Sequence, residues 1–211
     1  MLKRLASQTA TYGLTSILGR LIGNLLLPLQ TDRLSLHDFS MLSEVLTYAA
    51  VLSILFPLGL ETALFRYSND NPGDKVSTER KIISFQILAA IVMFPVAYAF
   101  LGYRMPELTS TDLCIVSLTL VADSILGIFL ATLRNHNQSF QFLKVRLGSI
   151  LFTIGLNLLF LSGISLFDQF NPVGINFRLI LYINFASSFL SFFLMVKSLT
   201  RFSWVFDREL N

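Results

Sequence analysis

The sequence predicts an all-α integral membrane protein with six transmembrane helices. Charged residues make up only 14% of the 211-residue chain, against about 25% in soluble domains, and the mean hydropathy is +0.65. In addition, six stretches approach the ~20 apolar residues that a helix needs to span a bilayer. Because these stretches lack the strict alternation of a β-barrel, and open sheets cannot lie in lipid, we expect helices.

In chain order, the predicted spans cover residues 9–30, 44–65, 82–103, 113–133, 147–167 and 179–196. The first span holds Arg20 near its centre, and the second is interrupted by Pro57 and Glu61. The fourth span holds Asp123 at its midpoint, whereas the third, fifth and sixth spans carry no charge. The connecting loops are short, so we expect residues 1–211 to form a single six-helix unit.

The basic residues predict how the helices are oriented. With the N-terminus in the cytoplasm, three basic residues (Arg33, Arg104 and Arg178) fall on the opposite side and Arg20 falls within the membrane. The other twelve fall in cytoplasmic segments: Lys3, Arg4, Arg66, Lys75, Arg80, Lys81, Arg134, Lys144, Arg146, Lys197, Arg201 and Arg208. This bias follows the positive-inside rule, and it places both termini in the cytoplasm.

The sequence lacks the patterns expected of an enzyme. Cys114 is the single cysteine, and the two histidines, His37 and His136, lie far apart, so neither a metal site nor a cofactor is expected. There is no glycine-rich phosphate loop, nucleophile elbow or pair of acids at short spacing. Membrane topology explains the basic loops, so the expected partner is the lipid bilayer and not nucleic acid.

The first span gathers small and polar residues on one helical face, among them Gly13, Ser16, Arg20 and Asn24. Small residues alone would indicate close helix packing. An arginine at mid-membrane, however, costs roughly 2.5–3.5 kcal/mol on insertion scales. We therefore expect Arg20, together with Asn24, to face a polar cavity or a substrate, with a structural ion pair or snorkelling as the alternatives.

Two acids are candidates for neutralising Arg20 or for carrying protons or cations. Asp123 lies at a predicted depth similar to that of Arg20, and its alternative role is a structural ion pair. Glu61 lies near the cytoplasmic end of the second span. Its alternative role is an interfacial ion pair with a cytoplasmic arginine such as Arg66.

The last two spans contain polar stripes. The residues are Ser149, Thr153 and Asn157 in the fifth span, and Asn184, Ser187, Ser188 and Ser191 in the sixth. Hydrogen bonds between helices are one explanation of these stripes. The lining of a cavity is the other, and it makes Asn157 and Asn184 candidate substrate-binding residues.

Several segments carry a family resemblance. Residues 5–13, Gly19-Arg20 and residues 27–31 resemble the first helix of bacterial polysaccharide flippases, which belong to the multidrug/oligosaccharidyl-lipid/polysaccharide exporter superfamily. The end of the second span, the connection at residues 133–142 and the tail at residues 206–210 are similar to the corresponding segments of that family.

This resemblance implies a flippase for undecaprenyl-pyrophosphate-linked oligosaccharides in the bacterial inner membrane, acting in O-antigen or other cell-surface polysaccharide biosynthesis. Such MATE-like transporters hold two six-helix lobes around a cavity whose cationic residues meet the lipid pyrophosphate. The resemblance implies that Arg20 has this role, and it assigns Glu61 and Asp123 to the cavity. Since six helices make one lobe, we expect a fragment or half of a transporter that pairs with a second lobe or another copy.

Two other functions stay open at this point. A multidrug or cation antiporter of the same fold would use Asp123 or Glu61 for proton coupling, although a cationic substrate should avoid Arg20. A membrane scaffold of a glycan-assembly complex would transport nothing.

Overall fold

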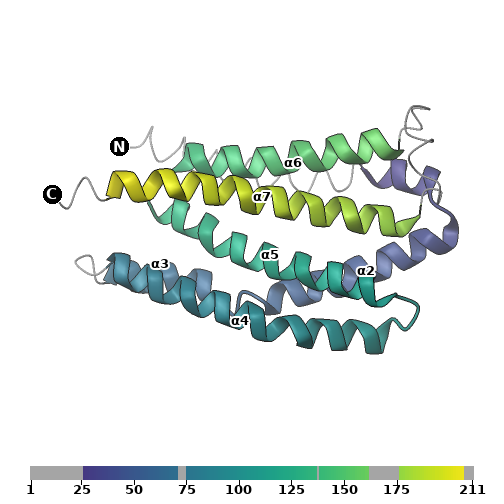
Figure 1. Ribbon diagram of the computed structural model, residues 1–211, viewed down its shortest axis with the longest axis horizontal. Coiled ribbons are helices and arrows are strands. Elements are labelled where there is room, and N and C mark those ends of the chain that lie inside the picture. The colour runs from purple at the N-terminus through teal and green to yellow at the C-terminus, as the bar shows by residue number, and fades with distance from the viewer. Residues whose placement is uncertain (1–25, 71–74, 137, 162–175, 207–211) are drawn as a thin grey trace.

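The computed structural model describes residues 26–70, 75–136, 138–161 and 176–206. Every regular element in these ranges is helical, and the helices run along an elongated bundle (Figure 1). The helices are α2 (Leu36–Leu55), α3 (Leu60–Asp70), α4 (Lys75–Arg104), α5 (Ser110–Asn135), α6 (Ser139–Leu161) and α7 (Phe177–Phe206). A further helical segment at residues 26–33 precedes α2. The all-α prediction is therefore confirmed for this part of the chain.

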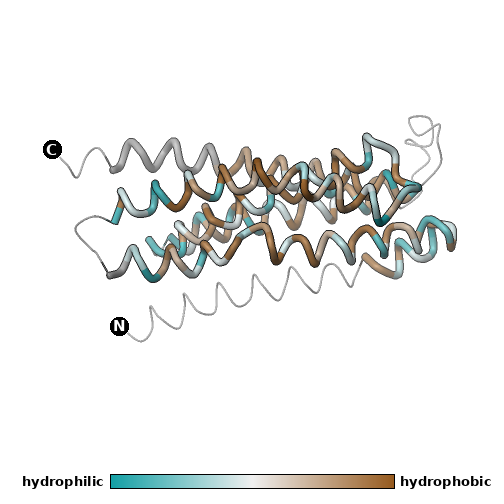
Figure 2. The backbone as a smooth tube through the Cα atoms, turned by 90° about the horizontal axis from the view of Figure 1, so that it is seen from below, coloured by the Kyte–Doolittle hydropathy of each residue, from teal (hydrophilic) through white to brown (hydrophobic). Residues whose placement is uncertain are grey.

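Five helical segments within the described ranges are long and apolar enough to cross a membrane. They are Leu36–Ser68, Lys75–Arg104, Ser110–Asn135, Ser139–Leu161 and Phe177–Met195. Hydrophobic residues predominate along the middle of the bundle and hydrophilic residues toward its ends (Figure 2), as the apolar core of a bilayer requires. This is the architecture of a multi-pass membrane protein. The predicted first span, residues 9–30, lies largely outside the described residues.

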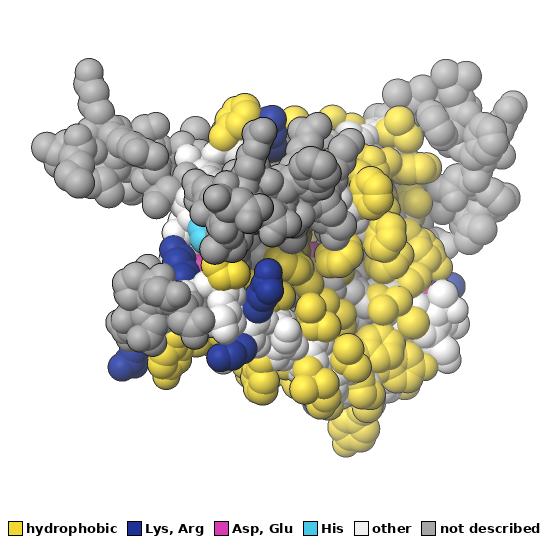
Figure 3. Space-filling model, turned by 60° about the vertical axis from the view of Figure 1, so that its left-hand side comes forward, with side chains coloured by type: hydrophobic (Ala, Val, Ile, Leu, Met, Phe, Trp, Pro, Cys, Tyr) yellow, Lys and Arg dark blue, Asp and Glu magenta, His cyan; other side chains and the backbone are white. Residues whose placement is uncertain are grey.

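Helix α5 lies between α4 and α7, α6 packs mainly on α7, and α3 packs on α4 and α5 (Figure 1). The largest group of buried apolar residues joins α2, α4, α5 and α7, and includes Leu42, Phe56 and Leu101. By contrast, Leu88 and Ile91 on α4 are exposed. Figure 3 shows an extensive hydrophobic flank, with Lys and Arg side chains gathered at one end of the bundle. Such a surface suits contact with lipid tails and headgroups, respectively.

A short turn separates α2 from α3 inside the second predicted span. Pro57 has no N–H with which to continue the helix, and Leu58 (φ 49°) and Gly59 (φ 71°) adopt left-handed backbone conformations. That region disfavours a leucine. The carbonyl of Phe56 accepts a hydrogen bond from Nε2 of the buried Gln86 in α4, at 3.1 Å. The interruption predicted at Pro57 is therefore confirmed, and Gln86 satisfies one of the carbonyls it frees.

Three helices begin well before the predicted span, at polar or charged ends, and α2 starts at Leu36 rather than at residue 44. Helix α4 starts at Lys75 rather than at residue 82, and α6 starts at Ser139 rather than at residue 147. Hydropathy identifies only the part of a helix that crosses the hydrocarbon layer, and the charged turns before it go undetected. Arg146, predicted to lie in a cytoplasmic loop, is therefore part of α6.

Candidate functional site

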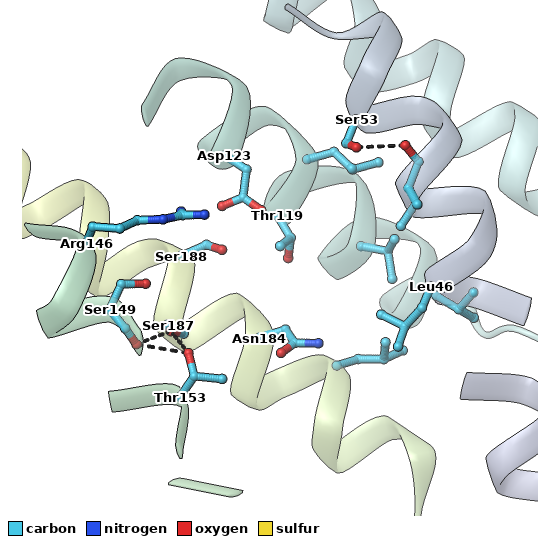
Figure 4. Close-up of a pocket in the computed structure, with 16 residues that line it drawn as sticks. Leu46, Ser53, Thr119, Asp123, Arg146, Ser149, Thr153, Asn184, Ser187 and Ser188 are labelled. Atoms are coloured by element: carbon cyan, nitrogen blue, oxygen red, sulfur yellow. Dashed lines mark hydrogen bonds between the residues drawn. The ribbon is translucent and has the colours of Figure 1, made fainter. Parts of the chain in front are cut away.

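A cavity of about 350 Å³ opens between α2, α5, α6 and α7 (Figure 4). Its polar lining consists of Ser53, Thr119, Asp123, Arg146, Ser149, Thr153, Asn184, Ser187 and Ser188, and its apolar lining of Val45, Leu46, Ala49, Ala50, Val116, Leu120 and Leu181. The volume falls within the range of small-molecule sites, about 300–1,000 Å³. Because all four helices belong to candidate membrane spans, the cavity lies within the membrane-spanning bundle.

Helical spacing explains why the polar side chains meet at the cavity. Residues three, four or seven positions apart share one face of an α-helix. Arg146, Ser149 and Thr153 have this spacing on α6, and Thr119 and Asp123 have it on α5. Arg146 is absent from the predicted site, because its charge fitted the pattern of cytoplasmic loops. Its spacing to Ser149 and Thr153 is the sequence signal that points to the cavity.

Asp123 and Arg146 supply the charges of the cavity lining. The guanidinium group of Arg146 points from α6 toward the carboxylate of Asp123 on α5, and Ser188 lies beside that carboxylate (Figure 4). Both charged side chains are exposed in the cavity. Among the ion pairs of the described residues, none joins Arg146 to Asp123. The carboxylate of Asp123 does interact with the Ser188 hydroxyl and with the charge of Arg146. Because both charged residues line the cavity, water or a polar ligand can solvate them there.

The wall formed by α6 and α7 is held by hydroxyl hydrogen bonds. Thr153 Oγ1 donates to the carbonyl of Ser149 at 3.0 Å, and Ser187 Oγ donates to the same carbonyl at 3.3 Å. The hydroxyls of Thr153 and Ser187 also contact each other (Figure 4). Asn157 is buried, and its Nδ2 donates to the Thr153 carbonyl at 2.8 Å. This hydrogen bond lies within α6, one turn from the cavity-lining Thr153.

The predicted site residues have different positions relative to the cavity. Asp123 and Asn184 line it, from α5 and α7 respectively. Asn157 is not part of its lining. Arg20 and Asn24 lie outside the described residues, so their predicted roles stay predictions.

Glu61, also predicted at the site, lies outside this cavity. Its Oε2 accepts a hydrogen bond from Nη2 of Arg134 at 3.2 Å, and the Arg134 guanidinium lies over the ring of Phe65. A Cβ added at Gly127 would approach Oε1 of Glu61 to 3.1 Å, so this glycine leaves room for the carboxylate. The ion-pair partner of Glu61 is therefore Arg134, and not Arg66, because α3 packs against α5.

A second polar group, the Glu79 cluster (Ser68, Lys75, Glu79, Asn135 and His136), joins α3, α4 and the C-terminal end of α5. Oε1 of Glu79 accepts from Nδ2 of Asn135 at 2.7 Å, and Oε2 lies 2.8 Å from Nε2 of His136. Nδ2 of Asn135 also donates to Ser68 Oγ at 2.7 Å, and Nζ of Lys75 donates to the Asn135 carbonyl at 3.4 Å. Both oxygens of Glu79 thus have protein partners.

Neither a protein-family model, nor a curated protein, nor a solved structure matches this chain. Within the described ranges, no group of three or more His, Cys, Asp or Glu side chains is placed to hold a metal ion. The cavity and its polar lining are therefore the features that indicate a function.

Proposed function

We propose that this chain is the N-terminal lobe of a MATE-like transporter that flips a lipid-linked oligosaccharide, such as an undecaprenyl-pyrophosphate sugar, across the bacterial inner membrane. The observation that carries the proposal is the cavity, where Arg146 lies among hydroxyl and amide groups inside a bundle of membrane-length helices. The resemblance of the first helix to polysaccharide flippases supports the same function.

The cavity offers a suitable group for each part of such a substrate. The guanidinium of Arg146 is able to bind two phosphate oxygens at once through charge-assisted hydrogen bonds. Thr119 and Asn184 offer hydrogen-bonding groups to sugar hydroxyls. Across the cavity, Leu46 and Ala49 of α2 form an apolar surface suited to the lipid portion.

Transport requires that the substrate bind differently to two conformations of the protein. In the proposal, this lobe and a second lobe or another copy rock around the substrate, with both termini of this lobe in the cytoplasm. Arg20, on the predicted first helix, would supply a second cation to the pyrophosphate.

Arg146→Gln tests the proposal in the complete transporter. Translocation of a fluorescent lipid-linked sugar in proteoliposomes should fall at least tenfold, equivalent to about 1.4 kcal/mol of lost binding. The matched control is Lys144→Gln, which removes a positive charge from the same helix outside the cavity lining and should preserve the rate. Undiminished translocation by Arg146→Gln would refute the role of the cavity. Arg20→Ala tests the predicted second cation in the same assay.

A same-fold cation antiporter is the second candidate, because Asp123 is exposed in the cavity without an ion-pair partner among the described residues. A cationic substrate bound there would lie close to the guanidinium of Arg146, which opposes its binding. Resistance of cells to cationic drugs separates the two functions. An antiporter should confer resistance that Asp123→Asn abolishes, whereas the flippase should confer none.

A further inference from the structure

The charged end of the cavity carries one charge of each sign. Arg146 and Asp123 face each other from α6 and α5 (Figure 4), and no described ion pair joins them. Elsewhere, Glu61 and Arg134 approach to 3.2 Å and bind each other directly. In the cavity, the two charges attract each other without a described ion pair, and both line a space that a ligand can enter.

These two charges disfavour a ligand that carries only one sign. An anionic group bound to Arg146 would place its charge near the carboxylate of Asp123, and like charges brought together oppose binding. A cationic group bound to Asp123 would meet the guanidinium in the same way. A ligand that carries both signs a short distance apart pairs with both residues and meets no such repulsion.

We infer that the cavity binds a phosphate that carries a primary ammonium close by, with the phosphate on Arg146 and the ammonium on Asp123. The hydroxyl of Ser188, beside Asp123, offers a second acceptor to the three donors of an ammonium group. This chemistry occurs in amino-sugar phosphates and in ethanolamine phospholipids. The inference rests on the proposed function and narrows its substrate to a zwitterionic class, such as a lipid-linked sugar with a free amine near the phosphate.

Calorimetric binding measurements on the purified full chain in detergent test the inference. The sugar probes are glucosamine 1-phosphate, glucose 1-phosphate and N-acetylglucosamine 1-phosphate, compared at a mildly acidic pH that protonates the free amine. Glucosamine 1-phosphate should bind about tenfold more tightly than the other two, because only its ammonium makes a charge-assisted hydrogen bond to Asp123.

Short-chain lipids form the second arm, with dihexanoyl-phosphatidylethanolamine compared with dihexanoyl-phosphatidylglycerol. The ethanolamine lipid should likewise bind about tenfold more tightly. An amine preference in the sugar arm assigns the site to an amino-sugar phosphate, and a preference confined to the lipid arm assigns it to a phospholipid headgroup. Absence of an amine preference in both arms overturns the inference.

Variants test whether Asp123 and Arg146 cause the preference for amine-bearing probes. Asp123→Asn should remove the preference for the amine while glucose 1-phosphate still binds, and Arg146→Gln should weaken every phosphate about tenfold. Lys144→Gln and Asp32→Asn, which change charges outside the cavity lining, should bind as the wild type does. An amine preference that survives in Asp123→Asn also overturns the inference.

The results distinguish this inference from the proposed function. Equal binding of all sugar phosphates that depends on Arg146 overturns the zwitterionic class and leaves the proposed flippase intact. Phosphate binding that is insensitive to Arg146→Gln, or absent altogether, removes the support for both. If Asp123→Asn fails to fold, the wild-type comparison of amine and non-amine probes still decides the question.

Discussion

Glu79 and Asp123 are both acids on long membrane helices, and each has a basic side chain nearby, yet their surroundings differ. The side chain of Glu79 is only 6% exposed, and its two oxygens are held by Asn135 and His136. Asp123 is exposed in a cavity, and among the described ion pairs none joins it to Arg146.

The difference separates a structural polar group from a candidate ligand-binding one. A buried network whose members satisfy one another stabilises the fold and leaves nothing to offer a ligand. Ionisable residues within membrane spans are costly to keep there, and such residues typically mark transport pathways. By this comparison, the Glu79 cluster holds α3, α4 and α5 together, whereas the cavity is the proposed substrate site.

The largest effect that tests this comparison is expected from replacing the two acids. Glu79→Ala should lower the free energy of unfolding by about 2–3 kcal/mol, because it removes a carboxylate that is only 6% exposed and that binds both Asn135 and His136. Asp123→Ala should lower it by no more than about 0.5 kcal/mol, because it breaks no described ion pair and removes a charge from membrane depth. Equilibrium unfolding in a denaturing detergent measures both. Similar losses of unfolding free energy for the two variants would contradict the distinction between the Glu79 cluster and the cavity.

A pair of serines gives a smaller and more closely matched test. Ser68 is buried; its hydroxyl donates to the Leu64 carbonyl and accepts from Asn135. Ser68→Ala should cost about 1 kcal/mol, the scale of hydrogen bonds between membrane helices. Ser188→Ala, at the cavity, should be nearly neutral in stability and should weaken binding of the amine-bearing probe. The same unfolding assay applies, and a loss larger for Ser188→Ala than for Ser68→Ala would contradict the distinction.

The smallest effect is expected at the Glu61–Arg134 ion pair. The side chains are 40% and 36% exposed, respectively, so solvent weakens the attraction between them, as at surface ion pairs. Glu61→Gln should therefore lower the free energy of unfolding by less than about 1 kcal/mol, as measured by the shift in unfolding midpoint. A larger loss, comparable to that of Glu79→Ala, would place this pair with the structural network.

Local features of the sequence predicted much of the fold. Apolar length predicted the membrane helices, and Pro57 predicted the break between α2 and α3, because both depend on neighbouring residues alone. The starts of α2, α4 and α6 were less well predicted, since polar and charged turns outside the hydrocarbon layer resemble loops in sequence. For the same reason Arg146 was assigned to a loop and not to the site. Its place on α6 becomes clear only once the start of that helix is known.

By itself, the sequence determined that this is a helical membrane protein and that Asp123 lies near the middle of a span. The tertiary structure decided which partners the charged residues have: Glu61 pairs with Arg134 of α5, and Asp123 shares a cavity with Arg146 of α6. The reason is physical. Which residues share one face of a helix depends on residues a few positions apart in the sequence. Which side chains meet across two helices depends on how those helices pack, and such residues lie far apart in the chain.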